Sequence, residues 1–215
     1  MKTPGETKTR VVLVRHGETE WNRVQRFRGR TDIQLNETGR RQARALAKRL
    51  SGWPLAAIYS SPLKRALQTA EPVAEACGLN VVILEGMTDV DYGTSAGLSP
   101  EEAAARDPEV HEIWVQTPLL TRFHGGESLQ QVQERAWSAL EEVSSVHKGE
   151  TILVVSHVVV NRVLICSALG LVGDAFWRIG QDNAAINIIE GANGLYQVLL
   201  LNDTSHLESL DGSAV

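Results

Sequence analysis

The sequence predicts an α/β fold, a three-layer sandwich in which helices cover both faces of a mixed, mostly parallel sheet of about six strands. Apolar runs of strand length alternate along the chain with longer segments of helical period. Several of these runs contain almost only Val, Ile and Leu, which indicates strands buried on both faces. The last two runs are joined by residues 190–194, where glycines and an asparagine favour a hairpin, so at least one strand pair should be antiparallel.

The runs expected to be strands are spread over the whole chain: Arg10 to Val14, Leu55 to Tyr59, Val81 to Leu84, Thr151 to Val155, Ala185 to Ile189 and Tyr196 to Leu201. The main helices are expected in four segments that each end close to a glycine: Glu37 to Ser51, Leu63 to Cys77, Ser128 to His147 and Val158 to Leu169. Asn36 and Ser61 are the expected N-caps of the first two, with Pro62 at the first helical position of the second.

Residues 85–126 contain three prolines and a weaker pattern, which indicates an insertion with short helices at Glu101 to Arg106 and Glu109 to Gln116. We expect a single domain over residues 1–215, with its core at residues 10–202. The polar tail at residues 203–215 is expected to be partly disordered.

Composition excludes several classes of function. The 215 residues are 43% hydrophobic and carry a net charge of −5, which argues against a general binder of nucleic acids or anionic membranes. Cys77 and Cys166 lie far apart in apolar contexts and suggest buried thiols in a reducing cytoplasm. The polar N-terminus lacks an apolar signal core, and Asn161 and Arg162 break the longest apolar stretch, so neither secretion nor membrane spanning is expected.

Basic and imidazole side chains follow three of the predicted strands at the point where each strand ends. Arg15 and His16 follow the first strand, and His157 follows the strand that starts at Thr151. Arg65 lies one turn into the helix that follows the strand at Leu55. Because open α/β sheets bind ligands at the carboxyl ends of their strands, we expect these side chains to form one site.

Two arginines, two histidines and a helix N-terminus form a suitable receptor for a tetrahedral dianion such as a phosphoryl group. A neutral imidazole can attack phosphorus through one ring nitrogen while a hydrogen bond to the other fixes the tautomer. A phosphohistidine formed in this way needs no metal and no cofactor, and we expect neither.

Three sequence blocks resemble the signature of the histidine phosphatase superfamily, the phosphoglycerate mutase-like group. They are LVRHGETEWN at residues 13–22, SSPLKRALQTA at 60–70 and VSH at 155–157, in the order of the family. Residues 28–43 also follow the family pattern, and the resemblance covers residues 10–202. It implies the phosphoglycerate mutase-like fold, with His16 as the phosphorylated nucleophile and Arg15, Arg65 and His157 as ligands of the phosphoryl oxygens.

The resemblance also implies binding residues around the phosphate. Asn22 matches a phosphate-pocket position, Arg28 and Gly29 belong to the matching stretch that follows it, and Val158 begins the helix behind His157. His124 precedes a glycine-rich loop similar to a substrate-side segment of the family. Each kind of residue could instead have a purely structural role. The histidines could be hydrogen-bonded to backbone groups at the strand ends, and the arginines could form structural ion pairs. Asn22 could cap a turn, and the loop after His124 could be a plain helix start.

The sequence departs from the family at the general acid, which is usually a Glu. Asp89 stands at that place, and Ser95-Ala96 replace the usual Trp-Glu pair before Gly97. We expect Asp89 to donate the proton, with Asp91 or Glu85 as the alternatives.

Four arginines form a basic loop after the first block: Arg23, Arg26, Arg28 and Arg30. This loop is either a solvated loop or an electropositive entrance for a substrate that carries a second anion.

These observations predict a metal-independent phosphomonoester phosphatase that acts through phosphohistidine on a small anionic metabolite. The alternatives are a bisphosphoglycerate-dependent phosphoglycerate mutase and a catalytically weak phosphate-binding or scaffold protein. The expected partner is a small phosphorylated metabolite, without nucleic acid or membrane, and a homodimer stays open beside a monomer.

Overall fold

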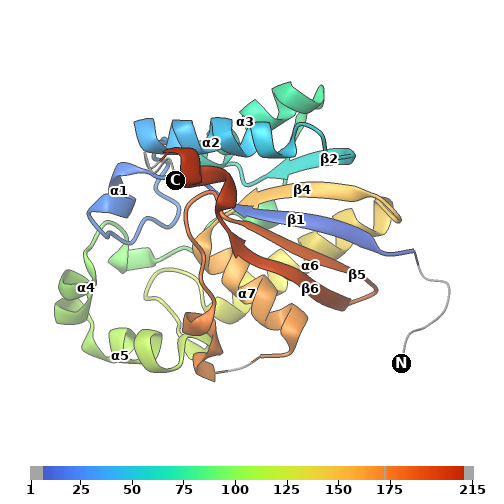
Figure 1. The fold of residues 1–215 in the computed structure, drawn as a ribbon. Coiled ribbons are helices and arrows are strands. Elements are labelled where there is room, and N and C mark those ends of the chain that lie inside the picture. Colours follow the sequence, from blue (N-terminus) through green and yellow to red (C-terminus); the bar gives the residue numbers. More distant parts are fainter. Residues whose placement is uncertain (1–6, 172, 211–215) are drawn as a thin grey trace.

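The computed structural model describes residues 7–171 and 173–210, which form one mixed sheet with helices on both faces (Figure 1). The strand order is β3-β2-β4-β1-β5-β6. The strands are β1 (Thr9–Arg15), β2 (Leu55–Ser60), β3 (Val81–Ile83), β4 (Thr151–Ser156), β5 (Ile186–Ala192) and β6 (Leu195–Asp203). Strands β1 to β4 pair in parallel, whereas β5 pairs antiparallel with both β1 and β6, so the predicted fold class is confirmed.

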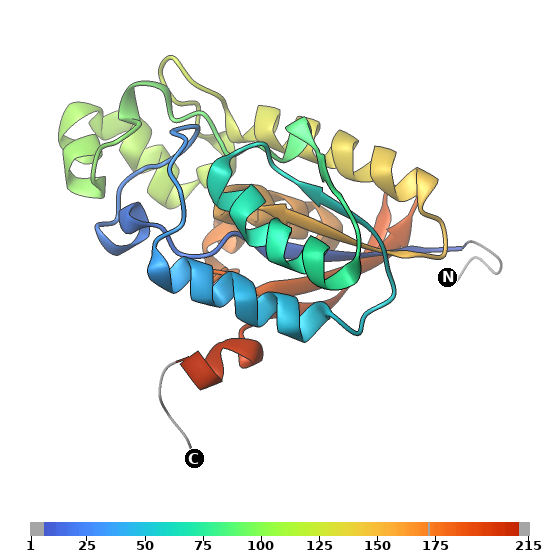
Figure 2. The ribbon, with the colours of Figure 1, turned by 90° about the horizontal axis from the view of Figure 1, so that it is seen from above.

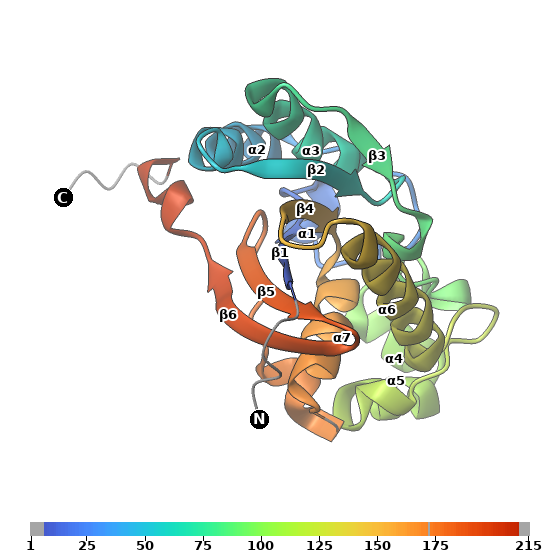
Figure 3. The ribbon, with the colours of Figure 1, turned by 90° about the vertical axis from the view of Figure 1, so that its right-hand side faces the viewer.

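Each face of the sheet has its own apolar core. Helices α2 (Glu37–Leu50) and α3 (Lys64–Cys77) cover one face, and α6 (Leu129–Val146) and α7 (Val158–Leu169) cover the other (Figure 3). Strand β1 alternates between the two cores, because successive side chains of a strand point to opposite faces. Val12 and Val14 pack in the core under α2 and α3, while Val11 and Leu13 pack in the core under α6 and α7.

The ends of the main helices follow their local sequence, with one exception. Asn36 caps α2 by accepting a hydrogen bond from the Gly39 amide at 2.8 Å, as predicted. The expectation that Ser61 caps α3 is wrong, because Leu63 is the N-cap and the helix begins at Lys64. The Ser61 hydroxyl lies instead 2.7 Å from Nε2 of His157, so a tertiary hydrogen bond has replaced the local cap.

The predicted hairpin between the last two strands is confirmed. Asn193 and Gly194 connect β5 to β6 with φ values of 51° and 78°, which is the pair of positive values that a tight hairpin turn requires.

The segment predicted as an insertion contains α4 (Pro100–Arg106) and α5 (Pro108–Gln116), close to the expected ranges. Together with α1 (Glu20–Arg23) it lies beyond the carboxyl ends of β1 and β4 (Figures 1 and 2). Short 3-10 turns complete the chain: η1 (Glu85–Met87), η2 (Gly93–Ser95), η3 (Pro118–Leu120), η4 (Gly173–Arg178) and η5 (Ser205–Leu210).

Part of the predicted tail is structured, because β6 continues to Asp203 and η5 lies beside α2. Residues 211–215 of that tail lie outside the described residues. None of the helices in the described part of the chain combines the length and the apolar character needed to cross a membrane.

Candidate active site

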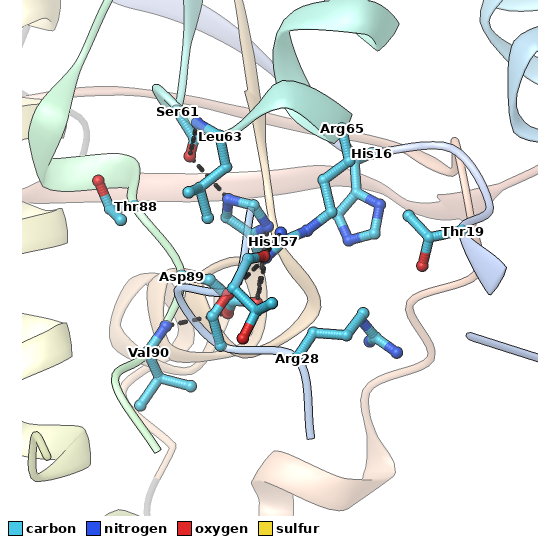
Figure 4. A network of polar contacts seen from close by, with 12 residues as sticks. His16, Thr19, Arg28, Ser61, Leu63, Arg65, Thr88, Asp89, Val90 and His157 are labelled. Carbon is cyan, nitrogen blue, oxygen red and sulfur yellow. Dashed lines mark hydrogen bonds and ion pairs between the residues drawn. The ribbon is translucent and has the colours of Figure 1, made fainter. Parts of the chain in front are cut away.

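The carboxyl ends of three neighbouring strands bring the predicted site residues together (Figure 4). Arg15 ends β1 beside Ser156 of β4, and His157 follows Ser156 directly. Arg65 enters from the first turn of α3, which follows the neighbouring strand β2. The imidazole centroids of His16 and His157 are 5.2 Å apart, and both rings are fully buried.

One hydrogen bond fixes the tautomer of His16. Nδ1 lies 2.7 Å from the carbonyl oxygen of Gly17, which can only accept, so Nδ1 carries the proton. Nε2 therefore presents its lone pair, and this buried atom has no hydrogen-bond partner. Burial lowers the pKa of His16 well below its usual range, and the positive charges of Arg65, Arg15 and Arg28 lower it further. His16 is thus a neutral imidazole with an unprotonated nitrogen at neutral pH.

Backbone carbonyls position the two guanidinium groups. Arg15 donates through Nη1 to the carbonyl of Gln181. Burial, followed by the charges of Arg28 and Arg162, lowers its pKa to about 9, so it remains a cation at neutral pH. Arg65 donates to the carbonyls of Thr31 at 3.0 Å and Gly29 at 2.7 Å.

Asp89 lies between Arg65 and His157. Its Oδ2 accepts a hydrogen bond from Arg65 Nη2 at 2.9 Å and lies 3.6 Å from His157 Nδ1. Burial, together with the charge of Arg65, lowers the pKa of His157 well below its usual range. The alternative acids lie elsewhere: Glu85 is exposed, and Asp91 Oδ1 accepts a hydrogen bond from the Gly93 amide. Asp89 is therefore the carboxylate of the three that touches both a predicted phosphate ligand and the cavity described below.

Five buried nitrogen atoms at this sheet edge have no hydrogen-bond partner among the described residues. They are Nε of Arg15, Nε2 of His16, Nε of Arg28, Nε of Arg65 and Nδ1 of His157. Buried polar atoms are nearly always paired in proteins, and an unpaired group costs roughly 1–3 kcal/mol. A cluster of unpaired nitrogens, most of them on cations, points to an anionic ligand with several acceptor oxygens.

The other predicted binding residues have different positions. Asn22 Oδ1 accepts hydrogen bonds from the amide and hydroxyl of Thr19, as part of a capping box at the start of α1. Gly29 acts through its carbonyl, which accepts from Arg65. The structure does not bring His124 to the cavity, because its exposed ring pairs with Asp107 at 2.7 Å.

Three of the four arginines of the basic loop form ion pairs with carboxylates. Arg23 pairs with Glu20, Arg26 with Glu102 and Arg30 with Glu127, at 2.9–3.2 Å. Arg28 contacts the Trp21 carbonyl and is the loop arginine with an unpaired buried Nε, so the loop contributes one free guanidinium edge to the site.

A cavity of about 430 Å³ opens beside Asp89, and its walls include Arg28 and Val158. This volume is in the range of small-molecule sites. Most of the lining is apolar: Phe27, Tyr92, Trp114, Val115, Val159 and Trp177. The remaining lining residues include Arg162, which in the sequence only interrupts an apolar stretch.

Arg135 is a positioning residue that sequence reasoning missed. From helix α6 its guanidinium donates to the carbonyls of Gly86, Thr88 and Asp89 at 2.7–3.2 Å. It also forms a two-nitrogen contact with Glu127 at 2.9 Å. These bonds hold the backbone that carries Asp89, and no local pattern around residue 135 indicates them.

Residues 11–204 match the family model described as histidine phosphatase superfamily (branch 1). A protein named phosphoserine phosphatase 1 from Hydrogenobacter thermophilus is 42% identical over 92% of this chain and 94% of its own length. A metal-independent phosphoserine phosphatase from Arabidopsis thaliana is 35% identical over 94% of this chain and 84% of its own length.

Among solved structures, a His-to-Ala variant of an Entamoeba histolytica phosphoserine phosphatase in complex with phosphoserine aligns with a TM-score of 0.84 at 29% identity. The alignment covers 93% of this chain and 99% of that structure. The match of the family model, the fold and the convergence of the three sequence blocks agree, and the chain belongs to branch 1 of the histidine phosphatase superfamily.

Proposed function

We propose that this protein is a metal-independent phosphomonoester phosphatase that works through a phosphohistidine at His16. The observation that carries the proposal is the set of unpaired buried nitrogens on Arg15, His16, Arg28, Arg65 and His157. One of these atoms, Nε2 of His16, carries a free lone pair, so the set offers both a receptor for an anion and a nucleophile.

In the first step, Nε2 of His16 attacks phosphorus and the bond between phosphorus and the substrate's ester oxygen breaks. The departing oxygen takes a proton from the carboxyl group of Asp89 and leaves as the alcohol. Arg15, Arg65 and His157 hold the oxygens of the transferred phosphoryl group, and the Gly17 carbonyl stabilises the imidazole as its charge increases.

In the second step, a water molecule attacks the phosphohistidine and gives its proton to the Asp89 carboxylate. The bond between phosphorus and Nε2 breaks, which restores neutral His16 and releases inorganic phosphate. Asp89 ends the cycle protonated, as it began, and the net reaction is hydrolysis of one ester bond.

Two relatives are named phosphoserine phosphatases, and phosphoserine occupies a related structure, so phosphoserine is the first physiological compound to assay. Cys77 and Cys166 form no disulfide, which supports a reducing compartment such as the cytoplasm for this activity.

The test is phosphate release from p-nitrophenyl phosphate and phosphoserine, with and without a chelator, by the wild type and His16→Ala. We expect chelator-resistant release that is lost in His16→Ala, and a phosphoryl adduct on His16 in rapidly quenched samples analysed by mass spectrometry. His147→Gln is the matched control, because His147 binds Tyr59 and Glu150 outside the site.

Turnover that survives in His16→Ala, or that disappears with the chelator, would contradict the proposal. Interconversion of phosphoglycerates that depends on bisphosphoglycerate, without phosphate release, would identify a mutase. Binding of phosphate without any turnover would identify a binding protein.

A further inference from the structure

Arg162 is a cavity residue that the proposed chemistry does not use. It lies in the second turn of α7, behind His157, and its Nε donates to the carbonyl of Ile179 at 2.9 Å. Its guanidinium carbon lies 5.3 Å from the ring centre of Phe176 and 5.2 Å from that of Trp177. These contacts fix the direction of a planar cation at the wall of the cavity.

Among the described residues, Asp182 is the carboxylate whose charge reaches Arg162, but it forms no ion pair with it. No Asp or Glu of the described chain lies within ion-pair distance of it, and its two terminal nitrogens form no hydrogen bond there. By contrast, Arg26 at the same cavity pairs with Glu102 at 3.1 Å. The cavity's own carboxylate, Asp89, is already bound to Arg65.

The charge of Arg162 reaches the phosphate receptor. It is one of the charges, after burial and Arg28, that lower the pKa of Arg15. Burial also lowers the pKa of Arg162 itself. Cations at a half-buried site repel one another. An anion that binds beside them offsets this repulsion, so its binding there is favourable.

The walls next to Arg162 are apolar and aromatic. Trp114 and Trp177 pack edge to face with ring centres 4.9 Å apart, and Val158 and Val159 complete this side of the cavity. The flat or aliphatic carbon skeleton of a substrate, called its apolar frame below, would bury its surface there. Asp89 is the single carboxylate among the lining residues that could bind an ammonium group of a substrate. The proposed mechanism uses this carboxylate as the acid.

We propose that Arg162 binds a second anionic group, a carboxylate or a second phosphate, on the alcohol half of the substrate. This inference rests on the proposed phosphatase function and ranks its substrates: phosphomonoesters of apolar alcohols that carry an anion and no amine are preferred, and phosphoserine is a weaker substrate. The apolar frame lies against Trp114 and Trp177, between the phosphoryl group at His16 and the anion at Arg162.

The experiment compares phenyl phosphate with its three carboxyphenyl isomers and with phosphoserine. The wild type is expected to prefer one carboxyphenyl isomer over both phenyl phosphate and phosphoserine in kcat/KM. Arg162→Met should reduce the ratio of kcat/KM for that isomer over phenyl phosphate by about 10-fold to 100-fold, which is the effect of one charge-assisted hydrogen bond. Arg162→Lys, which keeps the charge and loses the planar fork, should lie between the two enzymes.

The ratio of the two substrates is compared between the wild type and the variant because the acidity of each leaving group is the same for both enzymes. Its effect therefore cancels. A purely structural role of Arg162 would reduce both substrates together and leave the ratio unchanged, which would overturn the inference. Preference of the wild type for phosphoserine over every carboxyphenyl isomer would overturn this ranking. Arg44→Met, an exposed arginine of α2, is the control for the loss of one positive charge.

Failure of the inference and failure of the proposed function give different results. Absence of any His16-dependent hydrolysis of phenyl phosphate contradicts the proposed function, whereas an unchanged ratio contradicts only the role of Arg162. If Arg162→Met does not fold, inhibition of the wild type provides the second measurement. Carboxyphenylphosphonate should then inhibit more strongly than phenylphosphonate, and equal inhibition would contradict the inference.

Discussion

Oδ2 of Asp89 accepts a hydrogen bond from Nη2 of Arg65 at 2.9 Å, and both side chains are buried. The candidate acid and a candidate phosphate ligand therefore share one contact. A phosphoryl group bound at Arg65, as proposed above, would lie next to the carboxyl group of Asp89.

The Asp89→Asn variant should separate substrates by the basicity of their leaving group. We expect kcat/KM for an alkyl phosphate to fall by about 10²-fold to 10⁴-fold, because an alkoxide cannot leave without a proton. Hydrolysis of p-nitrophenyl phosphate should fall much less in the phosphorylation step, since nitrophenolate is a good leaving group. Single-turnover kinetics of phosphoenzyme formation measure this difference.

Asp89→Glu is the control for the same position, because it restores the residue type usual in the family. We expect it to retain activity on the alkyl phosphate. A normal rate of phosphoenzyme formation from the alkyl phosphate in Asp89→Asn would remove Asp89 from the role of acid.

Arg135→Met should disturb the same step without touching the substrate. Loss of the hydrogen bonds to the carbonyls of Gly86, Thr88 and Asp89 frees the backbone that positions the acid. We expect kcat for the alkyl phosphate to fall by about 10-fold to 100-fold, with a smaller loss for p-nitrophenyl phosphate. Equal losses on both substrates would show that Arg135 only supports the fold, and in the Asp89→Asn background Arg135→Met should add little.

Gly29→Ala should lower both stability and activity. Gly29 has a φ of +49°, and an added Cβ would lie 2.7 Å from the Val90 carbonyl and 2.9 Å from the Tyr92 ring. Its own carbonyl positions Arg65, so relief of the clash would move a phosphate ligand. Urea unfolding should show a loss of more than about 1 kcal/mol, the part caused by the backbone conformation alone.

Gly78→Ala provides the matched control for that substitution. Gly78 has a similar φ of +67° at the end of α3, but an added Cβ would meet no atom within 4 Å. It should therefore show the conformational cost with full activity. Equal effects of the two substitutions would contradict the clash at Gly29.

The two buried histidines predict how stability depends on pH. Burial lowers the pKa of His16 and of His157 well below the 6.5 expected in the unfolded chain. As the pH falls below 6.5, the unfolded chain binds protons that the folded protein does not, so the free energy of unfolding decreases. The decrease approaches about 1.4 kcal/mol per pH unit for each histidine, whereas above 6.5 their contribution is constant.

Urea unfolding between about pH 7.5 and 5.5 in phosphate-free buffer measures this dependence. His157→Asn should have a shallower slope than the wild type, since one of the buried histidines is gone. His206, whose pKa burial also lowers, still contributes to the remaining slope. An unchanged slope in His157→Asn would contradict a neutral buried His157.

The sheet and the strand-end residues could be predicted because both follow from local sequence. Apolar runs define the strands, and parallel strands bring their carboxyl ends to one edge, which places Arg15, His16 and His157 together without knowledge of the helices. The exact role of Ser61 could not be predicted, because a serine before Pro62 suits a helix cap equally well. Its choice of His157 is a tertiary contact.

Arg135 and Arg162 lie beyond local prediction for a related reason. Their guanidinium groups bind carbonyls that are remote in sequence, such as those of Gly86 and Ile179. His124 shows the opposite case: its loop resembles a substrate-side segment, but its exposed ring contacts Asp107 and does not line the cavity. One signal was available for Arg162, namely a cation within an apolar helix that starts at a site histidine.

Because β1 packs in both cores, the end of this strand should unfold only together with the rest of the sheet. The His16 amide donates to the Ser156 carbonyl at 2.9 Å, at the end of a central strand anchored on both faces. Hydrogen exchange at this amide should therefore require global unfolding, whereas loops of the segment 85–126 that wall the cavity can exchange by local opening. The position of the nucleophile should therefore be insensitive to changes in the exposed loops of that wall.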